Sequence, residues 1–420
     1  MREVITVFQD YKTSLTGYEK HFENILSFKE IVGSQNCILE ANGDFRMSHY
    51  VGCLIKGNTC LQVLPKIYSN NIDVKDKNEI KESLEFIYRL LLWSDFLKVK
   101  GLDESSIEEN DDSLIEIIIR IFVNRFLSLH QKNVYREYIS QDVDQLYVRG
   151  KILFVPSVLK QVQKPGYLRV QCDEFSINNL INRIIKTTIQ QLLFVTSNSE
   201  NKKLLRLGLS YLDEVDLIHL HKEVFGTVVF NRMNEDYQPL IELSEMLFQN
   251  LSSGLNQGNR NTVAFIVPLN ILFEKFFHSV LQSIYPSPER VVYQSTKYLA
   301  TNSSGNKNFY IQPDFVIFDK SEIKHILDTK FKNPYIENNK LKITATDLYQ
   351  VCTYAMRYNC LSIYLVYPLF KGQDKRSIIE QYSIPNDQKT ITLSIIQIDI
   401  TEINFDNIVQ AVKKINGLTT

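Results

Sequence analysis

The spacing of apolar and polar residues divides the first third of the chain into a strand-rich segment and two helices. Residues 36–67 alternate between apolar and polar side chains over short runs, which Asn-Gly and Gly-Asn turn pairs separate. This alternation predicts several short strands. Apolar residues three and four positions apart then predict helices over 78–97 and from about 113 to 130. We therefore expect a small sheet followed by helices.

The middle of the chain is mainly helical in pattern. Residues 146–153, LYVRGKIL, predict a strand. A helix is expected from Ser176, whose hydroxyl can cap the first turn, to about Phe194. Residues 203–250 again have apolar side chains at helical spacing. This region is therefore expected to be largely helical.

Two stretches have the composition of loops. Residues 103–112 are acidic and contain serine, and residues 252–261 are rich in Gly, Asn and Ser. The pattern of elements also changes near the second stretch, which indicates a domain boundary between 235 and 262. We therefore expect an N-terminal region, 1–245, and a C-terminal domain, 246–420.

The C-terminal domain has a regular succession of elements. A first amphipathic helix begins near Pro268, three strand-like runs follow, and a second helix precedes an uninterrupted apolar strand of the buried type. These elements are expected at 268–284, 290–298, 309–318, 324–331, 346–358 and 361–368. They predict a mixed sheet flanked by helices, so the chain is expected to be an α/β protein whose N-terminal part is α+β.

Composition narrows the class of protein. Of the 420 residues, 44% are hydrophobic and 23% are charged, which is usual for globular proteins, and no uncharged apolar run is long enough to span a membrane. The charged N-terminus lacks the apolar core of a signal peptide. The six cysteines include no CxxC pair, which argues against a zinc knuckle or a disulfide framework. A cytoplasmic protein without membrane contact is therefore expected.

Net charge and the common motifs exclude several functions. The net charge of −1 excludes a chain that coats nucleic acid indiscriminately, so any contact with DNA requires a local patch or a partner that holds the DNA. The sequence contains no GxxxxGK[ST], which argues against nucleotide binding by a P-loop in this chain. It also lacks GxGxxG, HExxH and GxSxG.

Polar residues interrupt two of the predicted C-terminal strands. Asp314 follows Pro313 inside an apolar run, and Asp328 and Lys330 lie two positions apart, so both point to one face of the next strand. If the two strands form a hairpin, two carboxylates and an ammonium converge. Burying two carboxylates together is costly unless a cation neutralises them, and Mg²⁺ binds carboxylate oxygens and water. The residues therefore predict a site that hydrolyses phosphodiester bonds.

The helices on either side of these strands offer further candidates. Glu274 in the preceding helix could add a third carboxylate to the metal site. Gln350 and Tyr354 lie four positions apart on one face of the following helix, and they could reach a phosphate or order Lys330. The simpler alternative is that one aspartate caps a turn while the other forms a surface ion pair with the lysine. The order of helix, strands and helix favours the catalytic interpretation.

Six segments occur in a characteristic order along the chain. They are YVGCLIKGNTCLQVLPKIY (50–68), YREYISQDVDQLYVRGKI (135–152), LFEKFF (272–277), QPDFVIF (312–318), LDTKFK (327–332) and DLYQVCTYA (347–355). In this order they resemble the McrC family, which comprises the nuclease subunits of McrBC and LlaJI-type restriction systems. The C-terminal segments resemble the PD-(D/E)xK nuclease domain of that family.

The resemblance implies a site and partners. Asp314 and Asp328 would be the metal carboxylates, Lys330 the catalytic lysine and Glu274 the helix acid of the family, with Mg²⁺ as cofactor and DNA as substrate. Members of the family have no nucleotide site and associate with a separate McrB-like AAA+ GTPase hexamer, whose GTP hydrolysis they stimulate. The N-terminal region would serve this interaction, and the chain would be the endonuclease subunit of a restriction complex in antiviral defence.

Two other functions stay open at this stage. The chain could be a non-catalytic adaptor that mainly activates the ring, although the intact Asp314, Asp328 and Lys330 argue against this. It could also be a stand-alone PD-(D/E)xK nuclease of DNA repair, which would cut DNA without a nucleotide or a partner. The residues do not indicate whether the DNA target must be methylated.

Overall fold

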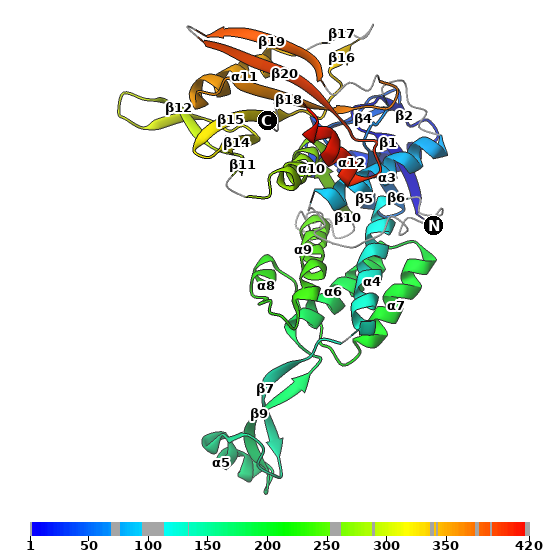
Figure 1. Cartoon of the computed structure of the whole chain (residues 1–420). Helices are drawn as coiled ribbons and strands as arrows, with labels where there is room; N and C mark the ends of the chain where they lie inside the picture. Colours follow the sequence, from blue (N-terminus) through cyan, green and yellow to red (C-terminus); the bar gives the residue numbers. More distant parts are fainter. Residues whose placement is uncertain are drawn as a thin grey trace. The chain divides into compact units, whose positions relative to one another are not determined.

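The chain forms two compact units in the computed structural model (Figure 1). The structure describes residues 2–68, 76–94, 113–132, 134–252, 262–287, 290–336, 340–341, 343–373, 378–386 and 389–415. The helical unit comprises the described residues of 115–264, and the sheet unit comprises those of 2–97, 112–114 and 265–420. The loop expected at 103–112 and nearly all of the linker expected at 252–261 lie outside the described residues.

Amphipathic helices make up most of the helical unit. They are α4 (Leu114–Lys132), α6 (Leu180–Val195), α7 (Ser199–Tyr211), α8 (Lys222–Gly226) and α9 (Gln238–Ser252). Their apolar faces are buried, as Ile118 of α4, Ile184 of α6 and Leu240 of α9 illustrate. The helices predicted over 113–130 and within 203–250 are therefore confirmed, with non-helical connections between α7, α8 and α9.

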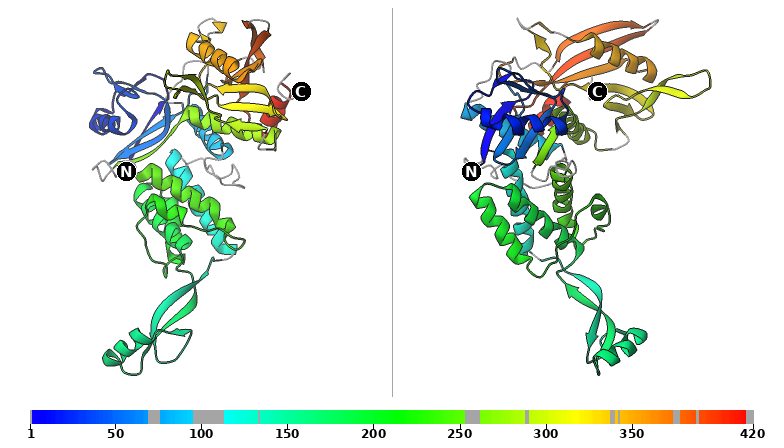
Figure 2. Two further views of the ribbon diagram at one scale, coloured as in Figure 1. Left: turned by 90° about the vertical axis from the view of Figure 1, so that its left-hand side faces the viewer. Right: turned by 180° about the vertical axis from the view of Figure 1, so that it is seen from behind.

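A long β-hairpin projects from the helices of this unit (Figures 1 and 2). β7 (Glu137–Gln145) pairs antiparallel with β9 (Leu168–Ser176), and the short β8 (Lys151–Ile152) pairs with the other edge of β9. α5 (Phe154–Gln163) lies at the far end of the hairpin. This helix carries exposed apolar side chains, which we call the apolar tip: Phe154, Val155, Val158, Leu159 and Val162.

The course of this hairpin corrects two predictions. The strand expected over 146–153 is wrong except in β8, because the chain turns at Gly150. Gly150 has a φ of +83°, and a Cβ atom here would lie 2.2 Å from the carbonyl oxygen of Gln171. The helix expected from Ser176 begins only after its N-cap Asn179, because Ser176 is still paired in β9.

Two small sheets form the N-terminal part of the sheet unit. One has the order β1-β6-β5-β10 and the other the order β2-β4-β3. Their strands are β1 (Glu3–Phe8), β2 (Thr13–Ser14), β3 (Cys37–Leu39), β4 (Asp44–Met47), β5 (Tyr50–Lys56), β6 (Thr59–Leu64) and β10 (Thr262–Pro268). The helices of this part are α1 (Phe22–Ser27), α2 (Lys29–Val32) and α3 (Lys77–Trp93). The strands predicted over 36–67 are thus confirmed.

The larger sheet of this unit has the order β11-β14-β15-β18-β20-β19. Its strands are β11 (Val291–Tyr293), β14 (Phe315–Asp319), β15 (Glu322–Thr329), β18 (Ser362–Leu369), β19 (Ile378–Asn386) and β20 (Lys389–Asp399). β14 and β15 form an antiparallel hairpin, whereas β15, β18 and β20 run parallel. The sheet is mixed, and the predicted α/β class is confirmed.

Helices cover both faces of the larger sheet (Figures 1 and 2). α11 (Ala345–Tyr358) packs on one face, where Val351 and Ala355 belong to the same buried cluster as Ile326 of β15. α10 (Leu269–Ile284) lies on the other face, with the ring centroid of Phe277 5.7 Å from that of Phe315. α12 (Phe405–Lys413) packs beside α10. The predictions of α10 and α11 are confirmed.

Two of the predicted strands are interrupted. The run 290–298 divides into β11 and β12 (Lys297–Thr301) at Gln294, whose φ is +50°. The run 309–318 divides into β13 (Lys307–Ile311) and β14, because Pro313 lacks the N–H that a ladder needs. β12 and β13 pair with each other in a separate two-stranded sheet, the β12–β13 hairpin. This hairpin and the strands β19 and β20 were not predicted.

The first and last parts of the chain share one core in the sheet unit. α3 packs on α10, and the ring centroid of Trp93 lies 6.0 Å from that of Phe276. The Lys371 backbone N–H donates to the carbonyl oxygen of Ile67 at 2.8 Å. The sheet unit thus combines residues from both of the regions that were expected to meet near residue 245. The roles expected for those two regions stay predictions.

Membrane spans and disulfides are both missing from the described structure. Among the described residues, no helix has the length and apolar character to cross a membrane. All six cysteines are described, and none of them forms a disulfide. Burial raises the pKa of the Cys37 thiol to about 11, so this thiol stays protonated at neutral pH.

Candidate active site

The hairpin of β14 and β15 brings two carboxylates to one place. Phe315 pairs with Leu327, so the same register continued by one residue puts Asp314 opposite Asp328. Residues opposite each other in an antiparallel pair project to the same face of the sheet. Asp328 is only 1% exposed, and it follows Ile326 on the face that α11 covers. The convergence expected from the sequence is therefore present.

Lys330 joins these carboxylates just after the end of β15. Its Nζ lies 2.5 Å from Oδ2 of Asp328. Its backbone N–H donates to the carbonyl oxygen of Val366 in β18 at 2.8 Å, which holds this part of the chain against the sheet. The two-residue spacing therefore directs Lys330 and Asp328 to the same face, as predicted.

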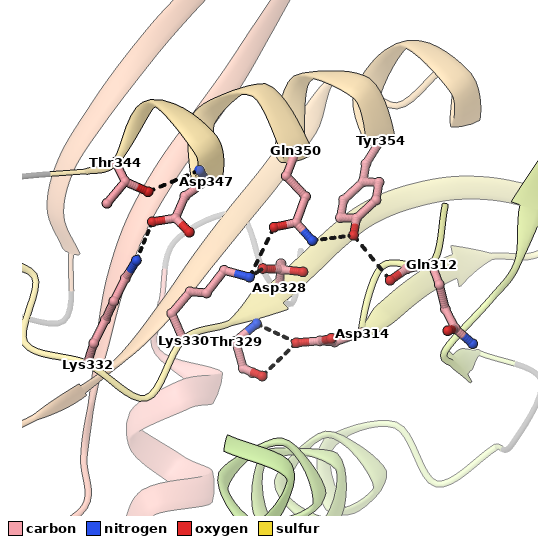
Figure 3. A network of polar contacts seen from close by, with 10 residues as sticks. All are labelled: Gln312, Asp314, Asp328, Thr329, Lys330, Lys332, Thr344, Asp347, Gln350 and Tyr354. Carbon is pink, nitrogen blue, oxygen red and sulfur yellow. Dashed lines mark hydrogen bonds and ion pairs between the residues drawn. The ribbon is translucent and has the colours of Figure 1, made fainter. Parts of the chain in front are cut away.

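Side chains of α11 form a hydrogen-bonded chain that begins at Lys330 (Figure 3). Lys330 Nζ donates to Gln350 Oε1 at 3.2 Å, and Gln350 Nε2 donates to the hydroxyl of Tyr354 at 2.6 Å. This hydroxyl donates to the carbonyl oxygen of Gln312 at 3.2 Å. Gln312 lies two residues before Asp314, so the chain of bonds links the ammonium to the segment that carries the first carboxylate.

Glu274 approaches the site from α10. It is 8% exposed, and its Oε1 accepts a hydrogen bond from Gln294 Nε2 at 2.9 Å. The backbone N–H of Gln294 donates to the carbonyl oxygen of Asp314 at 2.8 Å. Burial and then the charge of Asp314 raise the pKa of Glu274. The third predicted carboxylate is therefore held close enough to Asp314 for the two charges to interact.

Burial and mutual repulsion make these carboxylates hard to ionise. Burial, followed by the charge of Asp314, raises the pKa of Asp328 to about 7. Burial also raises the pKa of Asp314, against the effect of its hydrogen bonds from Thr329. Burial by itself would lower the pKa of Lys330, but the Asp328 and Asp314 carboxylates outweigh it and raise this pKa. The pocket therefore favours added positive charge.

The chemistry of the donor set fits a Mg²⁺ ion. Mg²⁺ is usually held by one or two carboxylates, and water and substrate phosphate fill its other positions. Asp328 supplies a buried carboxylate, and the half-buried Asp314 supplies a second one opposite it. The described ranges contain no group of three His, Cys, Asp or Glu side chains arranged to hold a metal ion. The role of Glu274 as a third ligand therefore stays a prediction.

Thr329 is part of this site and was not singled out from the sequence. Its backbone N–H and its hydroxyl both donate to Oδ2 of Asp314, each at 2.6 Å (Figure 3). A signal for it existed, since Thr329 lies between Asp328 and Lys330 and its hydroxyl can bond to a neighbouring carboxylate. Gln294 gave no such signal, because the direction of its side chain toward Glu274 depends on a positive φ at Gln294.

A second ion pair flanks the site. Lys332 Nζ lies 2.5 Å from Oδ2 of Asp347, and the Asp347 backbone N–H donates to Thr344 Oγ1 at 3.2 Å as a helix cap (Figure 3). The charge of Asp347 also contributes to the raised pKa of Asp328 and of Lys330. This pair fixes the start of α11, the helix that presents Gln350 to the site.

Comparisons with known proteins place this chain in one class of protein, the components of restriction systems. The family model described as "McrBC 5-methylcytosine restriction system component" matches residues 45–368. Because this match covers well over half of the chain, the chain belongs to the McrBC restriction system component family. The resemblance to McrBC systems expected from the sequence is therefore confirmed.

Solved structures support the fold. A chain of the half-complex from a tetradecameric assembly of Thermococcus gammatolerans McrB AAA+ hexamers with bound McrC is 22% identical, with a TM-score of 0.75. The match covers 98% of the present chain and 100% of that chain. A chain of the Thermococcus gammatolerans McrBC complex is 25% identical over 67% of the present chain and 88% of that chain, with a TM-score of 0.49. No curated protein matches the sequence.

Proposed function

We propose that this chain is the Mg²⁺-dependent DNA endonuclease subunit of a GTP-dependent restriction complex. The observation that carries the proposal is that the half-buried Asp314 lies opposite the buried Asp328, with the Lys330 ammonium beside them. Two carboxylates that resist ionisation in the absence of a cation, beside a lysine that stays charged, are suited to binding a divalent cation and a phosphodiester together.

The site residues would have different roles in hydrolysis. Asp314 and Asp328 would hold the metal, and Thr329 orients the first of them through two hydrogen bonds. Bound Mg²⁺ would supply Lewis-acid stabilisation of the phosphate and lower the pKa of a coordinated water. The products are a 5′ or 3′ phosphate and a hydroxyl, because water adds to phosphorus and one ester oxygen leaves.

Lys330 places a positive charge beside the two carboxylates. In the absence of a metal ion, the Asp328 and Asp314 carboxylates raise its pKa and so favour the ammonium form. It can donate hydrogen bonds to a phosphate oxygen as negative charge develops in the transition state. The Gln350 Oε1 atom fixes the ammonium by accepting a hydrogen bond from Lys330 Nζ at 3.2 Å, and Gln350 is therefore a positioning residue.

The proposal includes a separate AAA+ GTPase hexamer as partner. Two observations support it: the family, in which the related structure contains McrB AAA+ hexamers with bound McrC, and the lack of a P-loop in this sequence. The apolar tip of the helical unit offers a contact surface for a protein, because exposed apolar patches of this kind mark interaction sites. The partner would bring GTP hydrolysis and DNA recognition to the complex.

The decisive experiment measures DNA cleavage and GTP hydrolysis in the same reconstituted complex. Asp328→Asn and Lys330→Met are expected to abolish cleavage in Mg²⁺ while the stimulated GTPase rate stays near that of the wild type. Asp319→Asn is the matched control, because Asp319 lies in the same hairpin but is exposed and away from the site. Cleavage that survives both site variants would rule out the assigned nuclease site.

The same experiment separates the two other functions. A wild-type chain that stimulates GTP hydrolysis but never cuts DNA would be an adaptor, and the catalytic part of the proposal would fail. A chain that cuts DNA without the partner and without GTP would be a stand-alone nuclease, and the partner part of the proposal would fail.

A further inference from the structure

The β12–β13 hairpin extends from the sheet unit next to the candidate active site (Figures 1 and 2). It forms its own two-stranded sheet, with Tyr298 opposite Tyr310 and Thr301 opposite Lys307. β13 leads into Asp314 through only two intervening residues after Ile311. The base of the hairpin is therefore close to the Asp314 carboxylate along the chain.

α11 holds both strands of the hairpin at their bases. The Tyr358 hydroxyl donates to the carbonyl oxygen of Ser295 at 2.6 Å, just before β12, and Arg357 Nε donates to the carbonyl oxygen of Tyr298 at 2.5 Å. Tyr354 bonds to Gln312, just after β13. The helix that orders the catalytic lysine thus also fixes the direction of the hairpin.

The β12–β13 hairpin carries a net positive charge, although the whole chain does not. Residues 297–311 contain Lys297 and Lys307 and no acidic residue, whereas the whole chain has a net charge of −1. Lys307 lies over the ring of Tyr298 at 4.9 Å, and the guanidinium of Arg357 lies 4.7 Å from the same ring. These stacked cations are held in place rather than free to move, which suits phosphate binding.

Two neighbouring aromatic side chains on β13 are exposed. Phe309 is 74% exposed and Tyr310 is 66% exposed. Phe309 also has a φ of +54°, a conformation that costs free energy for a bulky side chain and is concentrated at functional sites. The hairpin thus leaves both rings outside its own core, and the Phe309 ring lies at a strained backbone position.

We propose that the β12–β13 hairpin binds the DNA substrate and directs it into the site, an inference that rests on the proposed nuclease function. Phe309 and Tyr310 would contact bases or sugars, and Lys307 would contact a phosphate. Nucleic acid fits this surface because cations bind its backbone and aromatic rings stack on its bases. The hairpin also continues directly into the site where a phosphodiester would be cut. It therefore supplies local DNA affinity to a chain without a basic surface overall.

The test measures binding of the full chain to a fluorescein-labelled DNA duplex of mixed sequence, by fluorescence anisotropy in EDTA at low salt. Phe309→Asn removes the aromatic ring, and asparagine tolerates the positive φ at this position. This substitution is combined with Tyr310→Ser. The pair is expected to weaken binding about tenfold. Lys307→Gln is expected to lower the slope of log affinity against log salt by about one.

Matched controls come from the β19–β20 pair of the same unit. Tyr382→Ser removes an exposed aromatic ring and Lys389→Gln an exposed lysine there, and both are expected to leave DNA affinity within about twofold of wild type, below the effect of one stacked base. Far-UV circular dichroism and the fluorescence of Trp93 check that each variant is folded. Equal losses in the hairpin and control variants would overturn the proposal, as would a wild-type chain without measurable DNA binding.

The outcomes also separate this inference from the proposed function. If the complex cuts DNA and the hairpin variants bind and cut like wild type, the hairpin proposal fails and the nuclease stands. If DNA binding depends on the hairpin but Asp328→Asn does not reduce cutting, the site assignment fails and the hairpin proposal stands. If the hairpin variants lose only association with the AAA+ partner, the surface binds protein and the DNA proposal is overturned.

Discussion

The Asp314 carboxylate receives two hydrogen bonds from Thr329, one from the backbone N–H and one from the hydroxyl, both at 2.6 Å and both to Oδ2. These bonds favour the ionised form of Asp314 against the opposing effect of burial. They also leave the other carboxylate oxygen for a metal ion. The orientation of the proposed metal ligand thus depends on the residue between Asp328 and Lys330.

Thr329→Val is therefore expected to impair the site without unfolding it. The substitution keeps the shape of the side chain and the backbone bond but removes the hydroxyl donor, which we expect to reduce the rate of DNA cleavage about tenfold, the equivalent of about 1.4 kcal/mol. Single-turnover cleavage at saturating Mg²⁺ measures this loss. Thr329→Ser should restore most of the rate, and a Val variant as active as wild type would contradict the role given to the hydroxyl.

The sequence predicted Asp314, Asp328 and Lys330 because their signal is local. Each is a charged residue in or beside an apolar strand, and side-chain alternation along a strand fixes which of them share a face. Gln294 could not be predicted, because its contact with Glu274 depends on a positive φ and on the packing of α10 against β11. Contacts made across elements require the tertiary structure.

The same contrast explains which elements were found. α10, α11 and β18 have strong periodicity and well-defined ends, and their prediction was correct to within one or two residues. The hairpin arm of β7 and β9 was not predicted, since each strand is defined by pairing with the other across the intervening residues 146–167. The break at Pro313 was also missed, although the missing N–H of proline is a local signal for it. The shared core of the first and last parts of the chain has no local signature at all.

The chain of hydrogen bonds from Lys330 through Gln350 to Tyr354 should behave as one unit. Gln350→Ala is expected to slow cleavage at least about tenfold, and Tyr354→Phe about fivefold, because each removes a link that orients the ammonium. The double variant should lose less than the product of the two effects. Tyr349→Phe is the control, since that tyrosine is exposed on the same helix. Fully multiplicative losses would show that the links act independently.

Exchange of the metal ion tests the carboxylate pair directly. With Ca²⁺ in place of Mg²⁺ we expect DNA to be bound but not cut, because calcium has a larger and looser coordination shell and activates water poorly. Isothermal titration calorimetry on the chain alone should detect Mg²⁺ binding that Asp314→Asn and Asp328→Asn each abolish. Unchanged Mg²⁺ affinity in both variants would show that the metal is held elsewhere.

His325 is expected to make the sheet unit sensitive to acid. Burial lowers the pKa of this histidine to about 4, so between pH 4 and 6.5 the unfolded chain binds a proton that the folded chain does not. The contribution of His325 to the free energy of unfolding is therefore complete above the ordinary pKa of histidine. This contribution is lost as the pH falls, by about 2 kcal/mol from pH 6.5 to 5. The raised pKa of Asp328 acts in the opposite direction, so a difference measurement is needed.

The comparison of wild type with His325→Gln in EDTA provides that difference. Trp93 is the only tryptophan of the chain and is half-buried against Phe276 of the sheet unit, so its fluorescence follows urea unfolding of this unit. Between pH 6.5 and 5 the wild type should lose more of its unfolding free energy than the variant. Parallel pH profiles would mean that His325 already carries its proton in the folded state, against the pKa shift given above.

A fragment of residues 246–420 is expected not to fold, although it contains every residue of the candidate active site. The fragment lacks α3, whose Trp93 ring lies 5.6 Å from Phe405 of α12, and whose Phe86 lies 6.4 Å from Phe331. Removing α3 exposes the apolar faces of α10 and α12 to water.

Circular dichroism and thermal melting of the fragment measure the outcome. The fragment is expected to melt without a cooperative transition and to precipitate, whereas the full chain should unfold cooperatively. In the full chain, Trp93→Ala is expected to lower the stability of the sheet unit by about 3 kcal/mol, and Trp93→Phe by less, because a ring still fills part of the space. A fragment that melts cooperatively and cuts DNA would show that the C-terminal region is a domain in its own right. The shared core would then be a docking contact between two separately stable parts.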